Sequence, residues 1–211
     1  MIKVLTIERE YGSGANEIAQ KVSDRLGWKL WDQLLTTEIA RQMECDKRHV
    51  EQREECRDPL YYRMFKSFLR GSFEGSLNTH RLKLADAEGI RAVTEQLVRR
   101  TAAEGNCVIV GRGSGYYLQN APDAFHVFIY APFAEKVRRL QQTGKSEKEA
   151  IELAETVDLD RAAFIKQHFG VEWPARQYFH LMINSTIGED AVVESILDSI
   201  NIYQAAHSVA K

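Results

Sequence analysis

Short apolar runs alternate with longer amphipathic stretches along most of the chain, which is typical of parallel α/β proteins. Apolar runs at 2–7, 107–110 and 125–130 predict three strands. The last two are apolar almost throughout, which indicates central parallel strands that helices cover on both faces. Shorter runs at 28–31 and 180–184 predict two further strands.

The stretches that separate these strands have helical spacing. Ile18, Val22 and Leu26 lie four residues apart on one helix face, and Gly27 is a natural stop for that helix. Similar spacing predicts helices at 88–104, 133–142 and 191–203, and a long charged helix with a loop within 145–170. We therefore expect a doubly wound α/β fold, in which ligands bind at the carboxyl ends of the strands.

A helical region interrupts this pattern between about 32 and 85. Asp32 is expected to cap its first helix, and a very polar segment at 46–57 and an aromatic-rich helix at 59–70 follow. The segment at 71–78 has the composition of a loop. We interpret this region as an insertion between sheet elements of a single domain. Its aromatic helix is expected to pack in the core or in a homodimer.

Composition narrows the class of protein. The 211 residues are 27% charged and 44% hydrophobic, which excludes a disordered chain and a fibrous fold. The 28 Lys and Arg residues and 30 Asp and Glu residues give a net charge of −2, so no basic field favours nucleic acid or an anionic membrane. Three cysteines form no CxxC pair, and we recognise no signal peptide or transmembrane stretch. We therefore expect a cytoplasmic protein with reduced thiols.

The first candidate for chemistry is the glycine-rich turn at 11–17, between a predicted strand and a predicted helix. Backbone N–H groups of such a turn can converge on a phosphate, and the helix N-terminus adds its dipole. The P-loop pattern also requires a lysine and a hydroxyl, but Ala15 and Glu17 occupy those positions. By itself, the turn is equally consistent with a tight connection that binds no ligand.

Two further segments carry candidate cations. Arg112 lies between glycines directly after the strand at 107–110, on the ligand side of the sheet. Its guanidinium suits a phosphate or a carboxylate, and an ion pair with a surface acid is the alternative. Asp158 and Arg161 stand one helical turn apart, so the acid can orient the arginine. Phosphoryl-transfer enzymes use arginines of this kind to neutralise charge in the transition state.

The histidines do not indicate a metal site. The six histidines have no metal-ligand spacing, so we predict no metal centre built from side chains. His126 and His180 lie within predicted strands, where structural roles are expected.

Taken together, these segments resemble the cytidylate kinase-like family, a branch of the P-loop nucleoside monophosphate kinases. The resemblance extends over nearly the full length, and the segments that carry it are LTIEREYGSG (5–14) with EIA (17–19), WKLWDQ (28–33), VIVGRGSGYYL (108–118), APDAFHVFIYAPFAEKVRR (121–139), DLDRAAF (158–164), GVEW (170–173) and HLMINS (180–185). It implies a three-layer α/β fold of P-loop kinase type, with a parallel sheet flanked by helices.

The resemblance also implies how the single domain is divided. The core would comprise about 1–31, 86–142 and 178–205. The helical insertion at about 32–85 would bind the acceptor nucleotide, with Asp32 at its start. A lid at about 143–177 would close over the donor and exclude water.

The resemblance implies a donor site for ATP with Mg²⁺. The donor loop would be formed by Gly12, Ser13, Gly14, Ala15, Asn16 and Glu17. Because Ala15 replaces the lysine of this loop, another cation is needed, and Arg9 just upstream or a lid arginine is the candidate. Val110 likewise stands where the kinases have an acid.

On the acceptor side, the resemblance implies that Arg112 holds the acceptor phosphate. Arg161, together with Arg138 or Arg139, would surround the phosphoryl group that is transferred. Asp158 would orient these arginines.

The leading hypothesis is ATP-dependent phosphoryl transfer to a small acceptor such as CMP or dCMP. The alternative is a non-catalytic nucleotide-binding or regulatory protein that has lost the loop lysine. An interaction module built on the aromatic helix is a third alternative. The expected partner is a small-molecule nucleotide, and neither nucleic acid nor membrane is expected.

Overall fold

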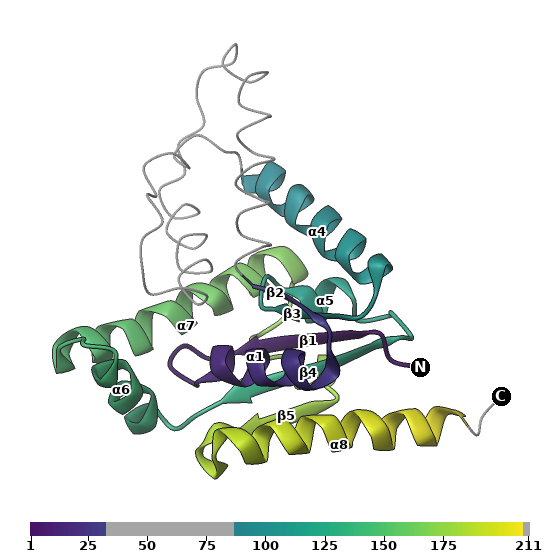
Figure 1. Cartoon of the computed structure of the whole chain (residues 1–211). Helices are drawn as coiled ribbons and strands as arrows, with labels where there is room; N and C mark the ends of the chain where they lie inside the picture. Colours follow the sequence, from purple (N-terminus) through teal and green to yellow (C-terminus); the bar gives the residue numbers. More distant parts are fainter. Residues whose placement is uncertain (33–86, 209–211) are drawn as a thin grey trace.

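The computed structural model describes residues 1–32 and 87–208, with side chains described for 1–32 and 91–207. The predicted insertion therefore lies, apart from Asp32, outside the described residues. The described part contains a parallel sheet of order β2-β3-β1-β4-β5. Its strands are β1 (Val4–Arg9), β2 (Lys29–Trp31), β3 (Cys107–Val110), β4 (Ala124–Tyr130) and β5 (Leu181–Asn184). This is the predicted parallel α/β arrangement (Figure 1).

The central strand β1 is longer at its carboxyl end than the sequence pattern predicts. It runs through Glu8 and Arg9, which pair with Phe128 and Ile129 of β4. The strand was predicted at 2–7 and therefore ends two residues later than expected. Backbone pairing with β4 continues through both residues, while their side chains are buried among other charged groups. The extension carries a carboxylate and a guanidinium to the edge of the sheet where ligands bind in this class of fold.

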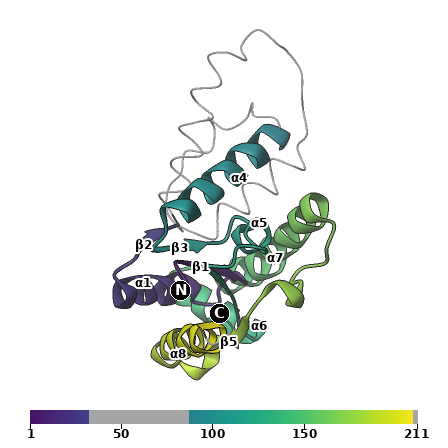
Figure 2. The same cartoon turned by 90° about the vertical axis from the view of Figure 1, so that its right-hand side faces the viewer.

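Helices cover both faces of the sheet, and each face has its own apolar cluster. On one face, α1 (Ala15–Leu26) and α8 (Glu189–Ser208) pack against β1 and β4. On the other face lie α4 (Ala87–Glu104), the short α5 (Ser114–Tyr117) and α7 (Glu147–Phe169). Figures 1 and 2 show the resulting three layers.

Two helices meet beyond the carboxyl ends of the strands. Helix α6 (Phe133–Gln142) follows β4, and its Leu140 packs with Tyr11 and with Val157 of α7 in a separate apolar cluster. Helix α7 is continuous for 23 residues, from its Ser146 N-cap to Gly170, without the loop expected within this stretch. Figure 1 shows α6 and α7 at the end of the sheet where β1 enters α1.

Most of the predicted elements outside the insertion are present. Helix α6 has the predicted bounds, and α1 ends at Gly27, whose left-handed conformation brings its N–H to the carbonyls of Asp24 and Ser23. The sequence pattern did not predict α5 or the short 3-10 helices η2 (Arg176–Tyr178) and η3 (Ser185–Ile187). No helix in the described ranges is long and apolar enough to cross a membrane.

His126 and His180 have the structural roles expected from their positions. The buried His126 ring shares a hydrogen bond of 2.7 Å with Thr6 Oγ1, and its backbone N–H donates to Nδ1 of His180 at 2.9 Å. The two rings stack with centroids 5.1 Å apart. Burial, and then the neighbouring His180, lowers the pKa of His126 to about 4. Neutral His126 is therefore part of the stable fold.

This depressed pKa predicts an acid-sensitive fold. Because an unfolded histidine has a pKa of about 6.5, the unfolded state binds the extra proton first, and stability falls as the pH drops from 6.5 towards 4. We expect His126 to contribute up to about 1.4 kcal/mol of this loss per pH unit. Urea unfolding of His126→Asn between pH 7.5 and 5 should show a shallower slope than wild type, whereas His207→Asn at an exposed site should not. Equal slopes for wild type and His126→Asn would contradict the prediction.

Candidate functional site

The glycine loop, residues 10–14, connects β1 to α1 at the carboxyl edge of the sheet. Gly12 and Gly14 both have a φ of 75°, in the left-handed region that glycine adopts without strain. A Cβ atom on Gly12 would lie 3.1 Å from Cβ of Lys136, and one on Gly14 would lie 3.0 Å from Nη1 of Arg139. The two glycines therefore allow α6 to lie directly on the loop backbone.

The start of α1 is suited to an anion. Its N-cap is Gly14, so no side chain caps the first turn. The first N–H groups of a helix lack partners within the helix and carry partial positive charge. Ala15 is buried here, Asn16 is half-buried, and Glu17 is exposed. The backbone geometry of a phosphate site is thus present, but its cation has to come from another element.

Polar contacts from α6 and η3 hold the loop backbone. Arg139 Nη1 donates to the carbonyl of Ser13 and, at 2.8 Å, to Oγ of Ser185. Ser185 Oγ also donates to the Ser13 carbonyl at 2.7 Å. The Ser13 hydroxyl turns back to the carbonyl of Glu10 at 2.8 Å. Arg139 therefore lies at the loop and fixes the path of its backbone.

Asp158 of α7 joins three donors from three different parts of the chain. Its Oδ1 accepts from the backbone N–H of Tyr11 at 2.8 Å and from Arg161 Nη1 at 3.2 Å. Its Oδ2 accepts from Nζ of Lys136 at 2.7 Å. The carboxylate thereby connects the glycine loop with α6 and α7. This is the orienting role predicted for Asp158, and it reaches Lys136 as well as Arg161.

Three buried guanidinium groups form an arginine cluster, which we define as Arg9, Arg112 and Arg161. Their side chains come from β1, from the segment after β3 and from α7, and they are 4%, 1% and 3% exposed. Arg161 Nη1 donates to the carbonyl of Arg9 at 2.8 Å. A Cβ atom on Gly111 would overlap the Arg9 guanidinium, so this glycine provides the space for that group. The predicted cations thus converge at the carboxyl ends of β1 and β3.

The backbone at Arg112 is unusual. Its φ is 63°, and it stands between Gly111 and Gly113, each with a φ of 68°. A non-glycine residue rarely adopts this conformation, and such strain is typical of functional sites. Burial lowers the pKa of Arg112 to about 9, opposed by Asp32 and assisted by repulsion from the other two arginines. Arg112 therefore remains charged near neutral pH while deeply buried.

Arg161 has donors that no described residue satisfies. Its Nε and Nη2 are buried without a hydrogen-bond partner among the residues of the described ranges. Burial, followed by repulsion from Arg9, lowers the pKa of this guanidinium to about 10. Buried polar groups are nearly always hydrogen-bonded, and a bound anion would satisfy these donors and relieve the repulsion. The donor set therefore fits a phosphate.

The structure brings most of the predicted residues together, with one exception. Arg138 is more than half exposed, and it donates from Nε and Nη2 to the carboxylate of Glu135 on its own helix, both at 2.7 Å. It is directed away from the arginine cluster. Asp32, directly after β2, is buried and stabilises the charge on Arg112.

Sequence reasoning missed two charged residues of the site. Lys136 lies four residues before the buried Leu140, so helical spacing alone would have placed it on the inner face of α6. Glu8 is buried beneath the arginines, where Ser114 Oγ donates to its Oε1 at 3.5 Å. Burial raises its pKa, although Arg9 and Arg161 oppose the shift. Nothing in the sequence indicated that Glu8 belongs to the site, because a polar residue directly after an apolar run is typical of a turn.

The described residues contain no metal centre built from side chains. Within 1–32 and 87–208, no three His, Cys, Asp or Glu residues are grouped to hold an ion.

The parallel sheet, the glycine loop and the buried arginines define an α/β protein of the P-loop kinase class. The sequence profile of the cytidylate kinase-like family matches residues 4–187. The chain therefore belongs to the cytidylate kinase-like family. No curated protein matches the sequence significantly.

Solved structures support the same fold. An uncharacterized protein from Eubacterium ventriosum superposes with a TM-score of 0.66 at 19% identity, covering 95% of this chain and 99% of its own. Shikimate kinase from Bacteroides thetaiotaomicron gives a TM-score of 0.54 at 12% identity, with coverage of 95% and 99%. Shikimate kinase from Acinetobacter baumannii, solved with shikimate, gives 0.52 at 13% identity, with coverage of 97% and 96%. At these identities, the likeness shows the fold alone.

The space at Gly111 generates a testable prediction. Gly111→Ala should destabilise the protein by more than about 2 kcal/mol, because left-handed strain adds to the overlap with Arg9. Gly27→Ala is the matched control, since Gly27 has a φ of 64° and nothing within 4 Å of the added Cβ. It should cost only about 1 kcal/mol. Urea unfolding that gives equal losses for both variants would show that Arg9 does not need this space.

Proposed function

We propose that this chain transfers a phosphoryl group from ATP to a small acceptor that itself carries a phosphate, of the nucleoside monophosphate class that includes CMP and dCMP. The observation that carries the proposal is the arginine cluster, in which Arg161 has two buried nitrogen donors without a partner among the described residues. Glu8, Asp32 and Asp158 already lie near these cations, but a phosphate would also satisfy the two buried donors of Arg161. A reaction that brings two phosphate groups together supplies such an anion.

The proposed roles follow the position of each group. Backbone N–H groups of Gly12 to Asn16 bind the donor phosphates at the start of α1. Arg112 holds the acceptor phosphate, with Asp32 beside it, and Arg161 stabilises the charge on the transferred group. Arg9 contributes its charge from beneath, and Arg139 keeps the loop backbone in place.

Phosphoryl transfer of this kind needs little covalent chemistry from the protein. The residues have to position the two substrates and neutralise charge, and both tasks suit buried arginines that are already held in place, as Arg161 is by Asp158. Mg²⁺ bound to the nucleotide supplies further neutralising charge. Glu17, exposed in the first turn of α1, is one carboxylate that the chain offers near the start of this helix.

One observation favours a second candidate, a nucleotide sensor without catalysis. Ala15, Asn16 and Glu17 stand where the P-loop pattern has its lysine and its hydroxyl, so neither group is present. Removal of one well-placed cation or donor typically slows such a reaction by about 100-fold or more. A sensor would still bind the triphosphate but would need no acceptor.

Ligand binding distinguishes these candidates. We expect ATP and one monophosphate to raise the melting temperature separately, and to raise it further together, because each binds only the native state. The screen should include ATP, GTP, CMP and dCMP, each with and without Mg²⁺. Stabilisation by ATP alone would favour the sensor. No stabilisation by any nucleotide would contradict both candidates.

The role of Arg161 can be tested by substitution. Arg161→Met should slow phosphoryl transfer by at least about 100-fold in single turnovers, because charge on the transferred group is no longer compensated. Arg100→Met is the control, since Arg100 is an exposed arginine paired with Glu104 on α4. Arg161→Lys should recover part of the rate. An Arg161→Met variant that folds and transfers at the wild-type rate would remove Arg161 from the proposed mechanism.

A further inference from the structure

Lys136 packs directly against the glycine loop. The first turns of α6 place its Cβ and its carbonyl oxygen 3.1 Å from the Cβ position of Gly12. Its side chain is 8% exposed, and Nζ lies 2.7 Å from Asp158 Oδ2 and 3.3 Å from Glu10 Oε2. The loop thus has a buried lysine beside it, although none in its own sequence.

The other cations near the loop have different positions. Arg139 is occupied by the Ser13 carbonyl and by Ser185. The guanidinium of Arg9 lies against Gly111, in the segment that follows β3. Arg9 and Arg139, two of the cations first considered as substitutes for the loop lysine, therefore contact other groups than Lys136 does.

The two carboxylates around Lys136 are not equivalent. Asp158 makes the shorter contact, is 12% exposed, and is also tied to the Tyr11 N–H and to Arg161. Glu10 makes the longer contact and is 23% exposed, and its carboxylate also accepts a long hydrogen bond of 3.4 Å from the N–H of Ala131. Asp158 is part of the framework, whereas Glu10 can leave Lys136 at a smaller cost.

We propose that Lys136 binds a terminal phosphate oxygen of the donor triphosphate, exchanging the Glu10 carboxylate for it while keeping Asp158. Glu10 then acts as an internal anion that compensates the buried ammonium until the nucleotide arrives. The exchange keeps the lysine paired in both states, which avoids a buried unpaired charge. This inference rests on the proposed function, because it requires a triphosphate in the glycine loop.

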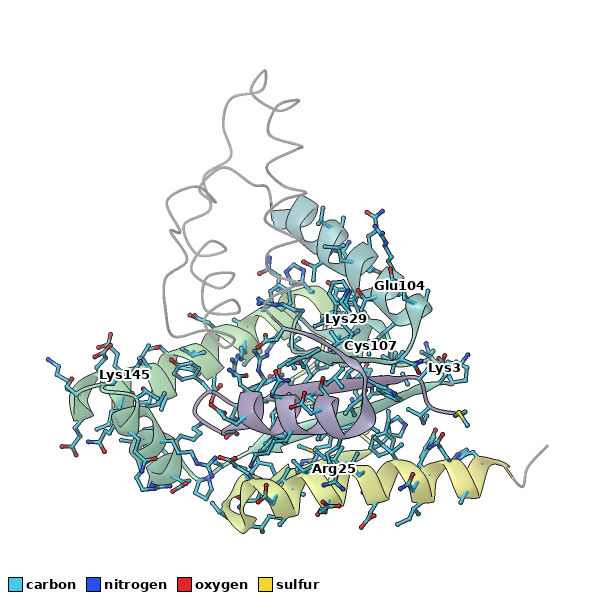
Figure 3. The ribbon with its side chains drawn as sticks, viewed as in Figure 1. Lys3, Arg25, Lys29, Glu104, Cys107 and Lys145 are labelled. Carbon is cyan, nitrogen blue, oxygen red and sulfur yellow. The ribbon has the colours of Figure 1, made fainter. Side chains whose placement is uncertain are left out.

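The direct test is titration calorimetry with ATP and with inorganic tripolyphosphate, both in the presence of Mg²⁺. Lys136→Met should weaken the binding of both ligands by at least about tenfold, because a charge-assisted contact is lost. Lys136→Arg should retain most of the affinity. Lys145→Met is the control, since Lys145 carries the same charge and lies half-buried in the turn between α6 and α7 (Figure 3), where its Nζ contacts Oγ1 of Thr143 at 3.5 Å.

If phosphate replaces Glu10 at Lys136, removal of the Glu10 charge should strengthen phosphate binding, whereas Lys136→Met weakens it. Glu10→Gln should tighten the binding of tripolyphosphate severalfold, because the phosphate no longer competes with a carboxylate for Lys136. In the Lys136→Met background, the same substitution should give a clearly smaller gain, since only the repulsion between Glu10 and phosphate is removed. A double-mutant cycle measures this difference. A merely structural ion pair would give the same gain in both backgrounds, from the lost repulsion alone.

The outcomes separate this inference from the function on which it rests. If wild type binds neither ATP nor tripolyphosphate, the proposed function fails. If wild type binds both and Lys136→Met binds them equally well, only the role of Lys136 is overturned. Equal gains from Glu10→Gln in both backgrounds would overturn the exchange. If Lys136→Met does not fold, the role of Lys136 is tested with the Lys136→Arg and Glu10→Gln variants. Unchanged affinity for tripolyphosphate in Glu10→Gln would then contradict the proposal.

Discussion

The Asp158 carboxylate is the contact on which the site depends. It accepts hydrogen bonds from the Tyr11 backbone and from Arg161, and it forms an ion pair of 2.7 Å with Lys136. These three partners belong to the glycine loop, α7 and α6, which are far apart in the sequence. If this carboxylate were absent, two buried cations would lose a compensating charge, and the loop would lose a contact to α7. The packing of α6 and α7 at the edge of the sheet therefore maintains the geometry of the loop.

The site contains strained and buried charged groups that lower the stability of the fold and that a purely structural region would not need. Arg112 is fully buried in a left-handed backbone conformation, and this burial lowers its pKa. Two donor nitrogens of Arg161 have no partner in the described ranges. These costs have a common explanation if an anion completes the cluster, because the cations are then held in place before the ligand arrives. Such preorganisation is what phosphoryl transfer requires of a protein.

Regular spacing made most of the fold outside the insertion predictable. The face formed by Ile18 and Val22 predicted α1, and the apolar run of β3 predicted a central strand, because burial imposes these patterns. The end of β1 was not predictable, since Glu8 and Arg9 are compensated by residues distant in sequence. In the site, Arg9, Arg112 and Arg161 were each named as separate candidates from the sequence, and the structure places them close together. Arg138 and Arg139 were offered as alternatives and Lys136 was not considered, because similarity to a motif does not say which side of α6 faces the loop.

The central claim is that a buried cluster of cations performs phosphoryl transfer although the glycine loop has no lysine. The most direct measurement is a single-turnover reaction of the full chain with ATP labelled at its terminal phosphate, Mg²⁺ and a panel of nucleoside monophosphates. The account predicts transfer of the label to one or a few of these acceptors, faster than hydrolysis to free phosphate. If the protein binds ATP but transfers no label to any of them, the claim of a kinase is contradicted and the nucleotide sensor is favoured.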